Sequence, residues 1–352
     1  MIKIYFRSLF FFTLLLSSVM LVSGCRETLL PADKALVSDN FEDDTPDDDF
    51  DLPPVIDPNP DNPNQSLQAW SEAHQGLQDV FSKLVTEGDG YTQFYYRALV
   101  DGRPELNDSL RGKLDSYFKY TNDFDPRRLL GPSSSNEERR FKKAFWINFY
   151  NACTVNIVSK NYDEIVSARE GLHSLGIWSR PLCKIGGGLL SLDQVEHAIL
   201  RNGEARGELR SSSPKALPAR LKANHDFFDY RIHFAVNCAS ASCPQLSRIV
   251  FSSRNVDALL EKLEKDFWTI GKEAVSPHLP QARLNNKTLK INPIIGSWYS
   301  VDFPDDLAVY ISRFTRLPNG TRVSTFSYSW KPNEAPSPSN GHSIIYQEDW
   351  HL

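Results

Sequence analysis

The chain has 352 residues, with 44 acidic side chains against 39 Lys and Arg, so its formal net charge is -5. Residues 1–65 hold 12 of the acidic groups and 4 of the basic ones, so the remainder is close to neutral. It therefore lacks the clustered Lys and Arg that a nucleic-acid surface needs, and we expect no nucleic-acid partner. The remaining length is sufficient for one large hydrophobic core.

Residues 1–24 are expected to be a signal peptide. Lys3 and Arg7 precede an apolar run over 8–22 that is too short and wrongly flanked for a stable membrane span. The run ends in Val22-Ser-Gly-Cys25, which resembles the lipobox of bacterial lipoproteins. The resemblance implies cleavage before Cys25, acylation of Cys25 by fatty acids such as palmitate, and attachment to the membrane through this lipid. The next residue is Arg26 rather than Asp, which by resemblance to enterobacterial sorting favours the outer membrane of the cell envelope.

Residues 25–65 are expected to be a disordered tether. From Asp39 to Asp61 there are ten acidic residues, several prolines and no Lys or Arg. Such a segment cannot bury enough apolar surface to offset its chain entropy, and its like charges extend it. A calcium-binding loop is the alternative, but the acidic run lacks the central glycine of an EF-hand loop.

The first part of the domain is expected to be helical. Three segments have apolar residues at helical spacing: 66–87, 106–122 and 136–160. Asn136 is the expected N-cap of the third helix, because Glu137 and Glu138 follow in its first turn. A shorter helix is expected after Ser191, which forms a capping-box pattern with Gln194 three residues later.

Strands are expected in the second half. They are a hairpin over 181–191 around Gly186-Gly187-Gly188, a strand over 230–237, a strand at 289–291 after an Asn-Asn turn, and a closing strand at 326–330. Helices first and strands later predict an α+β fold, in which N-terminal helices pack on a small, mainly antiparallel sheet. We expect a single domain over 66–331 and a loose tail over 332–352.

Five segments carry a resemblance to a known family. They are Ala144–Asn151, Leu192–Arg201, Arg231–Pro244, Ile294–Phe303 and Phe326–Trp330. In order and spacing they resemble the bacterial family called domain of unknown function 547, over roughly residues 137–331. The resemblance implies no activity. In the family pattern, a cysteine is more regularly found at the position of Cys238 than at that of Cys243.

The candidate site combines a helix and a strand. On the helix, Asp193, His197 and Arg201 are spaced to form one polar stripe, in which a carboxylate can hold the His197 ring. A solvated face with weak ion pairs is the alternative for Glu196 and His197. On the expected strand over 230–237, His233 would point away from Cys238, so His197 is the expected base.

The cysteines leave the chemistry open. Apart from Cys25, the four cysteines allow three disulfide pairings, including Cys153–Cys183 with Cys238–Cys243. A disulfide at Cys238 would remove the nucleophile. A zinc ion held by Cys238, Cys243, His197 and His233 is an alternative, although Cys-x4-Cys spacing is loose for zinc, and we expect no metal or cofactor.

The leading functional hypothesis is a thiol-dependent hydrolase or transferase acting on an amide or ester in the envelope. Cys238 would attack, His197 would be the general base, and Asn148 or Asn151 would orient the imidazole. Glu196 and His233 complete the expected site. The alternative is a non-catalytic lipoprotein that binds a ligand or protein partner in the same polar pocket, and the state of Cys238 distinguishes the two.

Overall fold

The computed structural model describes residues 63–88, 91–123, 126–168, 175–201, 225–268, 282–285, 287–304, 306–314 and 316–335. The expected signal peptide, the tether as far as residue 62 and the tail from residue 336 lie outside the described residues. Within those ranges, no helix has the length and apolar character needed to cross a bilayer.

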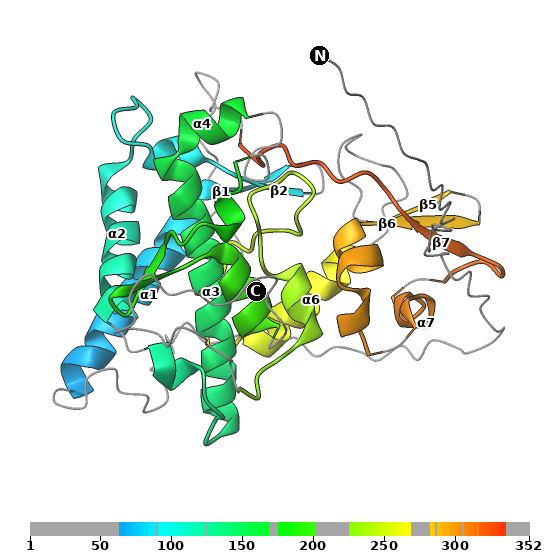
Figure 1. The fold of residues 1–352 in the computed structure, drawn as a ribbon, viewed down its shortest axis with the longest axis horizontal. Helices are drawn as coiled ribbons and strands as arrows, with labels where there is room; N and C mark the ends of the chain where they lie inside the picture. Colours follow the sequence, from blue (N-terminus) through cyan, green and yellow to red (C-terminus); the bar gives the residue numbers. More distant parts are fainter. Residues whose placement is uncertain are drawn as a thin grey trace, which may run out of the picture.

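Helices dominate the part of the molecule that comes first in the chain. The α-helices are α1 (Pro63–Leu84), α2 (Asp108–Asp123), α3 (Asn136–Lys160), α4 (Tyr162–Ser167), α6 (Val256–Trp268) and α7 (Leu307–Ile311). Shorter helical turns are η1 (Tyr96–Leu99), η2 (Pro126–Leu129), η3 (Ile177–Ser179), η4 (Gln194–Leu200), η5 (Tyr230–Phe234), η6 (Ile294–Trp298) and η7 (Ser300–Asp302). Figure 1 shows α1 and α2 packed together beside α3, which runs through the middle of the molecule.

Helix α3 has the bounds that the sequence predicts. Its N-cap is Ser135 rather than Asn136, because the Ser135 backbone is extended and its hydroxyl accepts the Glu138 N–H at 3.1 Å. Side chains from Phe141 to Ser159 are buried around the whole helix. A helix buried on all sides forms the centre of a core, and its polar side chains must find partners there.

The strands of the described residues form three small sheets. They are β1 (Val85–Gly88) with β2 (Tyr91–Phe94), β3 (Cys183–Ile185) with β4 (Gly188–Leu190), and β5 (Ala282–Asn285), β6 (Thr288–Ile291) and β7 (Arg322–Thr325). The pairings between the described strands are antiparallel except that of β6 with β7, which is parallel. The α+β class is confirmed, although the strands do not join into one sheet.

The glycine hairpin is confirmed. Gly186 and Gly187 connect β3 to β4 with φ angles of 57° and 73°. A two-residue turn with both φ angles positive matches the twist of the flanking strands, and glycine adopts it without steric cost. A disulfide from Cys183 of β3 to Cys153 ties this hairpin to α3.

The strand predicted over 230–237 is wrong. The segment begins as the 3-10 helix η5, capped by Asp229, whose carboxylate accepts the Arg231 N–H at 3.1 Å. The alternation that indicated a strand does not separate two faces, because Ile232 and His233 are both in the core. The chain therefore turns sharply before Cys238.

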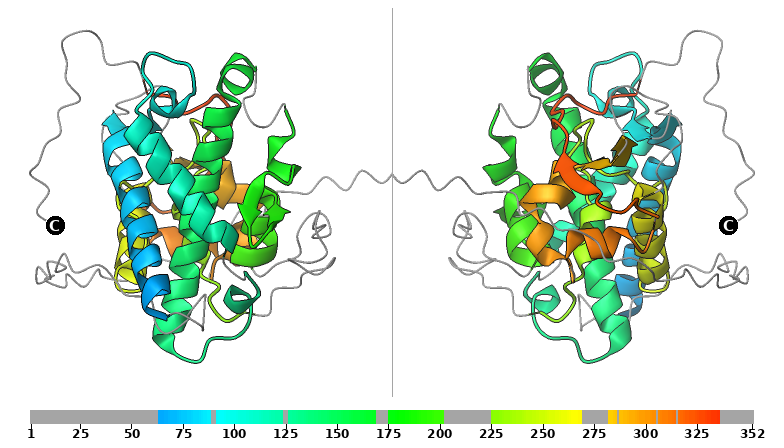
Figure 2. Two further views of the ribbon diagram at one scale, coloured as in Figure 1. Left: turned by 90° about the vertical axis from the view of Figure 1, so that its left-hand side faces the viewer. Right: turned by 90° about the vertical axis from the view of Figure 1, so that its right-hand side faces the viewer.

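The closing strand predicted at 326–330 is also wrong. Strand β7 ends at Thr325, and the residues after it cross the Cys238–Cys243 loop instead of pairing in a sheet. The Ala241 N–H donates to the Lys331 carbonyl at 2.6 Å, and the Ser242 N–H donates to the Ser329 carbonyl at 3.3 Å. In Figures 1 and 2 this segment, in red, runs from β7 across the molecule towards β1, β2 and α4.

The last described residues are packed rather than loose. Asn333 and Ala335 are buried, and the Phe94 N–H of β2 donates to the Asn333 carbonyl at 3.0 Å. Helix α1 likewise begins at Pro63, before the expected boundary at residue 66. The folded unit thus extends beyond both ends of the expected domain.

Candidate functional site

The Cys238–Cys243 loop is held from both sides by asparagines. The Asn237 amide accepts the Ala239 N–H at 2.9 Å and donates to the Pro244 carbonyl at 2.7 Å. The Asn333 N–H donates to the Ala239 carbonyl at 2.9 Å. Ala239 has a φ of 61°, the left-handed region that residues with a Cβ rarely occupy. These bonds over-determine the loop, which is how such a conformation persists.

Cys238 is not a free thiol, because it forms a disulfide with Cys243. The prediction of Cys238 as nucleophile is therefore wrong for this state of the protein, since a bonded sulfur carries no thiolate. The zinc alternative fails for the same reason. Around the disulfide, the Tyr328 hydroxyl lies 3.3 Å from the Cys238 sulfur and 3.4 Å from the Cys243 sulfur, and the Ser240 hydroxyl lies 3.2 Å from the former.

Asn148 and Asn151 do not orient an imidazole. Asn148 exchanges two hydrogen bonds with the backbone of Phe251, at 2.7 and 2.9 Å. Asn151 donates to the Ala235 carbonyl and accepts the Asn237 N–H, at 2.9 and 2.8 Å. Both amides use their donor and acceptor to fix backbone segments against α3. Their predicted role is corrected to a structural one.

His197 does not contact Cys238 through any hydrogen bond of the described residues. Its Nε2 lies 3.3 Å from an Asp193 oxygen, and its Nδ1 lies 3.1 Å from an Arg201 nitrogen. The polar stripe along this helix is therefore confirmed, and so is its capping box, in which Ser191 and Gln194 exchange two hydrogen bonds. Because both ring nitrogens already have partners, His197 is badly placed to act as a general base.

His233 is the histidine with the geometry of a base. Its Nε2 lies 2.7 Å from an Asp302 oxygen, and the ring is 1% exposed. Among the described residues, its Nδ1 has no hydrogen-bond partner. Burial lowers the pKa of His233, although Asp302 acts in the opposite direction, so the ring is neutral near pH 7.

Asp302 is held by Arg201 as well as by His233. The Arg201 guanidinium donates to both oxygens of Asp302, at 2.6 and 2.9 Å. Burial alone would raise the pKa of Asp302, but the hydrogen bonds from His233 and Arg201 outweigh it and hold that pKa below its usual value. The ionised carboxylate fixes the proton of His233 on Nε2, which leaves the Nδ1 lone pair as the acceptor.

Glu196 lies close enough to His233 and to Tyr328 for its carboxylate charge to act on the pKa of each. It is 8% exposed and accepts a hydrogen bond from the Tyr150 hydroxyl at 2.9 Å, and Tyr299 hydrogen-bonds it as well. Burial first, and then the Glu196 charge, raise the pKa values of Tyr150, Tyr299 and Tyr328. The three phenols therefore remain protonated and can donate hydrogen bonds.

Aromatic rings cover this centre. Tyr299 stacks on His233 with ring centroids 4.4 Å apart, and the Arg201 guanidinium also lies 4.4 Å from the Tyr299 ring centroid. The ring centroids of Trp298 and Tyr328 lie 4.9 Å apart, and Trp298 is 43% exposed. The centre therefore borders solvent through large aromatic side chains of η6 and the segment after β7.

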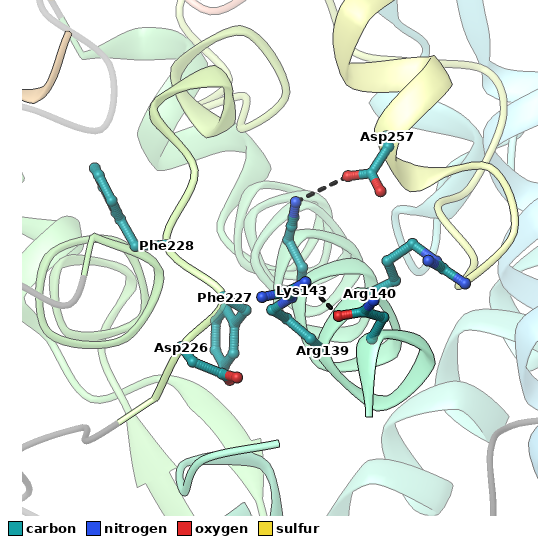
Figure 3. Close-up of a pocket in the computed structure, with 8 residues that line it drawn as sticks. Arg139, Arg140, Lys143, Asp226, Phe227, Phe228 and Asp257 are labelled. Carbon is teal, nitrogen blue, oxygen red and sulfur yellow. Dashed lines mark hydrogen bonds and ion pairs between the residues drawn. The ribbon is translucent and has the colours of Figure 1, made fainter. Parts of the chain in front are cut away.

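A separate polar cleft lies at the N-terminal end of α3 (Figure 3). It has a volume of about 250 Å³ and is lined by Asn136, Arg139, Arg140, Lys143, Asp226, Phe227, Phe228 and Asp257. Figure 3 shows the Lys143 ammonium directed at Asp257, which it contacts at 3.0 Å, and it contacts Asp229 at 2.7 Å. Burial alone would raise the pKa of Asp229, but Arg231 and Lys143 lower it to about 2. These charges join α3, η5 and α6, so they have a structural role.

The structure brings Glu196 near His233 and near Tyr328, whose hydroxyl contacts both sulfurs of the Cys238–Cys243 disulfide, and the other neighbours differ from those expected. Sequence reasoning missed Tyr150, Tyr299, Asp302 and Tyr328, and it used Arg201 only as part of a stripe. All five lie within the segments that carry the family resemblance. These residues could have been found from the sequence, because each is an acidic, basic or phenolic side chain inside a segment that carries the resemblance. In the described ranges, no three His, Cys, Asp or Glu side chains are placed to hold a metal ion.

Comparison with known proteins gives one match. Residues 134–268 match the model of a family described as "Protein of unknown function, DUF547". The match includes Glu196, His233 and both cysteines of the loop, whereas Tyr299, Asp302 and Tyr328 lie beyond it. No curated protein and no solved structure matches the chain significantly.

Proposed function

We propose that the protein, whose residues 134–268 match the DUF547 family model, is a hydrolase or transferase acting on an amide or ester. The catalysis would be acid–base catalysis by His233 and Asp302. The observation that carries the proposal is the buried His233 ring, which has one nitrogen on Asp302 and the other without a partner among the described residues.

Each residue has a distinct task in this proposal. His233 Nδ1 accepts the proton of an attacking water or acceptor hydroxyl, and the resulting imidazolium donates it to the leaving group. Asp302 fixes the tautomer and stabilises the imidazolium, and Arg201 keeps Asp302 ionised and in place. The Tyr299 phenol is a donor beside the histidine and can stabilise a developing oxyanion. Because its ring covers His233, it must move to admit substrate.

The proposal replaces the thiol nucleophile of the sequence hypothesis. With Cys238 bonded to Cys243, the attacking group is a water or a substrate hydroxyl. The neutral state of His233 supports this role, because only a neutral imidazole accepts a proton. The rate should therefore fall as the pH drops through the pKa of His233, which lies below the ordinary histidine value.

The site of action is proposed to be the bacterial envelope. The basic start of the chain, the apolar run after it and Val22-Ser-Gly-Cys25 support a lipoprotein that is anchored to a membrane by the lipid on Cys25. Arg26 favours the outer membrane. Metabolic labelling with a fatty-acid analogue tests this point. The wild-type chain should be labelled and Cys25→Ala should not, and equal labelling of both would contradict it.

The catalytic proposal is tested with the full chain and a panel of p-nitrophenyl esters and amino-acyl p-nitroanilides. We expect turnover that His233→Gln abolishes and Asp302→Asn reduces. His225→Gln is the matched control, because His225 is also a buried histidine but contacts the Ile199 carbonyl. Nitrogen NMR of the imidazole should show His233 neutral with Nδ1 unprotonated near pH 7. Turnover that persists in His233→Gln, or no turnover of any substrate, would contradict the proposal.

A second candidate function is non-catalytic binding of a ligand or protein partner at the same centre. The specific observation that favours it is the exposed Trp298 ring beside Tyr328, which offers an apolar surface next to buried polar groups. If this alternative holds, neither the wild-type protein nor His233→Gln turns over any of the substrates. Trp298→Ala would instead reduce the amount of envelope material that copurifies with the protein.

A further inference from the structure

We propose that Cys238 and Cys243 form a thiol–disulfide exchange centre in which Cys243 is the leaving thiolate and Cys238 is the sulfur that an external dithiol attacks. This activity is independent of the proposed hydrolysis at His233. It assigns a substrate class, a dithiol, to a pair of cysteines within the family-matched segment.

The first argument is the asymmetry of hydrogen bonding to the two sulfurs. The Cys238 backbone N–H donates to the Cys243 sulfur at 2.9 Å. The Tyr328 hydroxyl also donates to the Cys243 sulfur, at 3.4 Å. Among the described residues, the hydrogen-bond partners of the Cys238 sulfur are the hydroxyls of Ser240 and Tyr328, which also contact each other at 2.6 Å. A backbone amide cannot turn away as a hydroxyl can, so Cys243 has the fixed donor.

Fixed donors stabilise a thiolate. A hydrogen bond to the charged form of an acid favours that form, and a thiol that ionises more readily leaves faster in disulfide exchange. Tyr328 can serve as a donor at neutral pH because burial, helped by Glu196, raises the pKa of its phenol. Of the two bonded sulfurs, Cys243 is therefore the better leaving group.

The second argument is that the loop does not depend on the disulfide for its shape. Asn237 holds the backbone at Ala239 and Pro244, and Asn333 holds the Ala239 carbonyl. On the outer side, residues 329 and 331 pair with the backbone of Ser242 and Ala241. After reduction, the Cys238 N–H should still point at the Cys243 sulfur. The exchange can therefore run in both directions without refolding the loop.

The exchange step is balanced by the external dithiol. One thiolate of the dithiol attacks the Cys238 sulfur, the Cys238–Cys243 bond breaks, and Cys243 leaves as a thiolate. The second thiolate of the dithiol then attacks its own sulfur in the mixed disulfide, and Cys238 leaves and takes a proton. The dithiol becomes a disulfide, and the protein disulfide is reduced by two electrons.

The other disulfide supplies an internal control. Cys153 and Cys183 are both 0% exposed, whereas Cys238 and Cys243 are 5% and 6% exposed. No hydrogen bond of the described residues reaches the Cys153 or Cys183 sulfur. The native protein should therefore open the short loop first, while the bond between α3 and β3 stays closed.

The experiment has two steps, both with the native full chain. In the first, graded dithiothreitol is added, free thiols are blocked with N-ethylmaleimide, and the modified cysteines are mapped by mass spectrometry. In the second, the partly reduced protein is alkylated with iodoacetamide from pH 5 to 9, and the rates at Cys238 and Cys243 are compared. We expect Cys238 and Cys243 to appear first, and Cys243 to react roughly tenfold faster than Cys238 at pH 6 to 7, as a difference of about one pKa unit implies.

Variants test the donors. Tyr328→Phe should shrink the preference for Cys243 severalfold. Tyr310→Phe, which removes a buried phenol hydroxyl next to Glu264, should not change it. If Tyr328→Phe does not fold, the single variants Cys238→Ser and Cys243→Ser compare the remaining thiols directly. Faster alkylation of Cys238, or simultaneous reduction of both disulfides only on unfolding, would overturn the proposal.

Discussion

The two disulfides of the described residues lie in different surroundings. Cys153–Cys183 links residues 30 apart in the sequence, joins α3 to β3, and is wholly enclosed by the core. Cys238–Cys243 links residues 5 apart, within one loop, beside a phenol, a hydroxyl and a backbone N–H. The first connects two elements, whereas the second connects two ends of a loop that hydrogen bonds already hold.

This difference assigns the two disulfides different roles, one in the stability of the fold and the other in thiol–disulfide exchange. In the chain-entropy account, a cross-link stabilises a protein more when it closes a longer loop. The long-range disulfide therefore contributes mainly to the free energy of unfolding. The short one contributes less, and donors around its sulfurs make it more suited to exchange. The same contrast yields predictions of decreasing size.

The largest effect should come from removing the long-range disulfide. Replacing Cys153 and Cys183 together by alanine should lower the free energy of unfolding by about 4 kcal/mol, the value for a loop of this length. The paired alanine variant of Cys238 and Cys243 should lower it by about 2 kcal/mol. Urea denaturation of both variants measures the difference. An equal loss, or the reverse order, would contradict the division of roles.

A smaller effect should come from Glu334, in the segment that crosses the short loop. Burial raises the pKa of Glu334 to about 7, although Arg97 and Tyr162 act in the opposite direction. The folded state therefore binds this proton more tightly than the unfolded state, so stability is lost as the pH rises from about 4.5 to about 7. Glu334→Gln should stabilise the protein by about 3 kcal/mol at pH 8 and have little effect at pH 4.

Thermal unfolding at several pH values measures this effect. Glu137→Gln is the control, because Glu137 is an exposed carboxylate in the first turn of α3. A gain in stability that does not change with pH would show that the effect of Glu334→Gln comes from packing and not from titration.

The smallest effect concerns the backbone of the short loop. Ala239 has a φ of 61°, which costs a residue with a Cβ about 1 kcal/mol relative to glycine. Ala239→Gly relieves this cost, so its free energy of unfolding should lie about 1 kcal/mol above that of the matched variant Ala241→Gly. Ala241→Gly, two residues on and without a positive φ, should lower it by roughly 0.5–1 kcal/mol. Guanidinium denaturation compares the two, and equal losses of stability in both variants would show that the Ala239 conformation is not strained.

Local signals predicted the elements that depend on neighbours in the sequence. The bounds of α3, the capping box of Ser191 and Gln194, and the Gly186-Gly187 hairpin each follow from residues within a few positions of one another. The pairing of Cys238 with Cys243 was one of the alternatives that cysteine counting left open. The α+β class followed from the order of these elements.

The errors arose where distant residues decide the structure. His233 can be buried because its Nε2–H donates a hydrogen bond to Asp302, 69 residues later, so the alternating pattern around it did not mark two faces of a strand. Asn148 and Asn151 were assigned a catalytic role because they are polar residues in a largely apolar helix. Their amides instead bond to backbone groups more than 80 residues away in the sequence. No local pattern encodes such pairings.

The segment that ends the described residues holds the cysteine loop in place, so a shorter polypeptide would lose these contacts. Asn333 bonds to the backbone of both Phe94 and Ala239, so one residue connects the first hairpin of the domain to the cysteine loop. A polypeptide cut to residues 134–268 would contain the family-matched segment but would lose the partner of His233 and the phenol that contacts both sulfurs. The family-matched segment is therefore shorter than the folded unit, which among the described residues extends from α1 to Ala335.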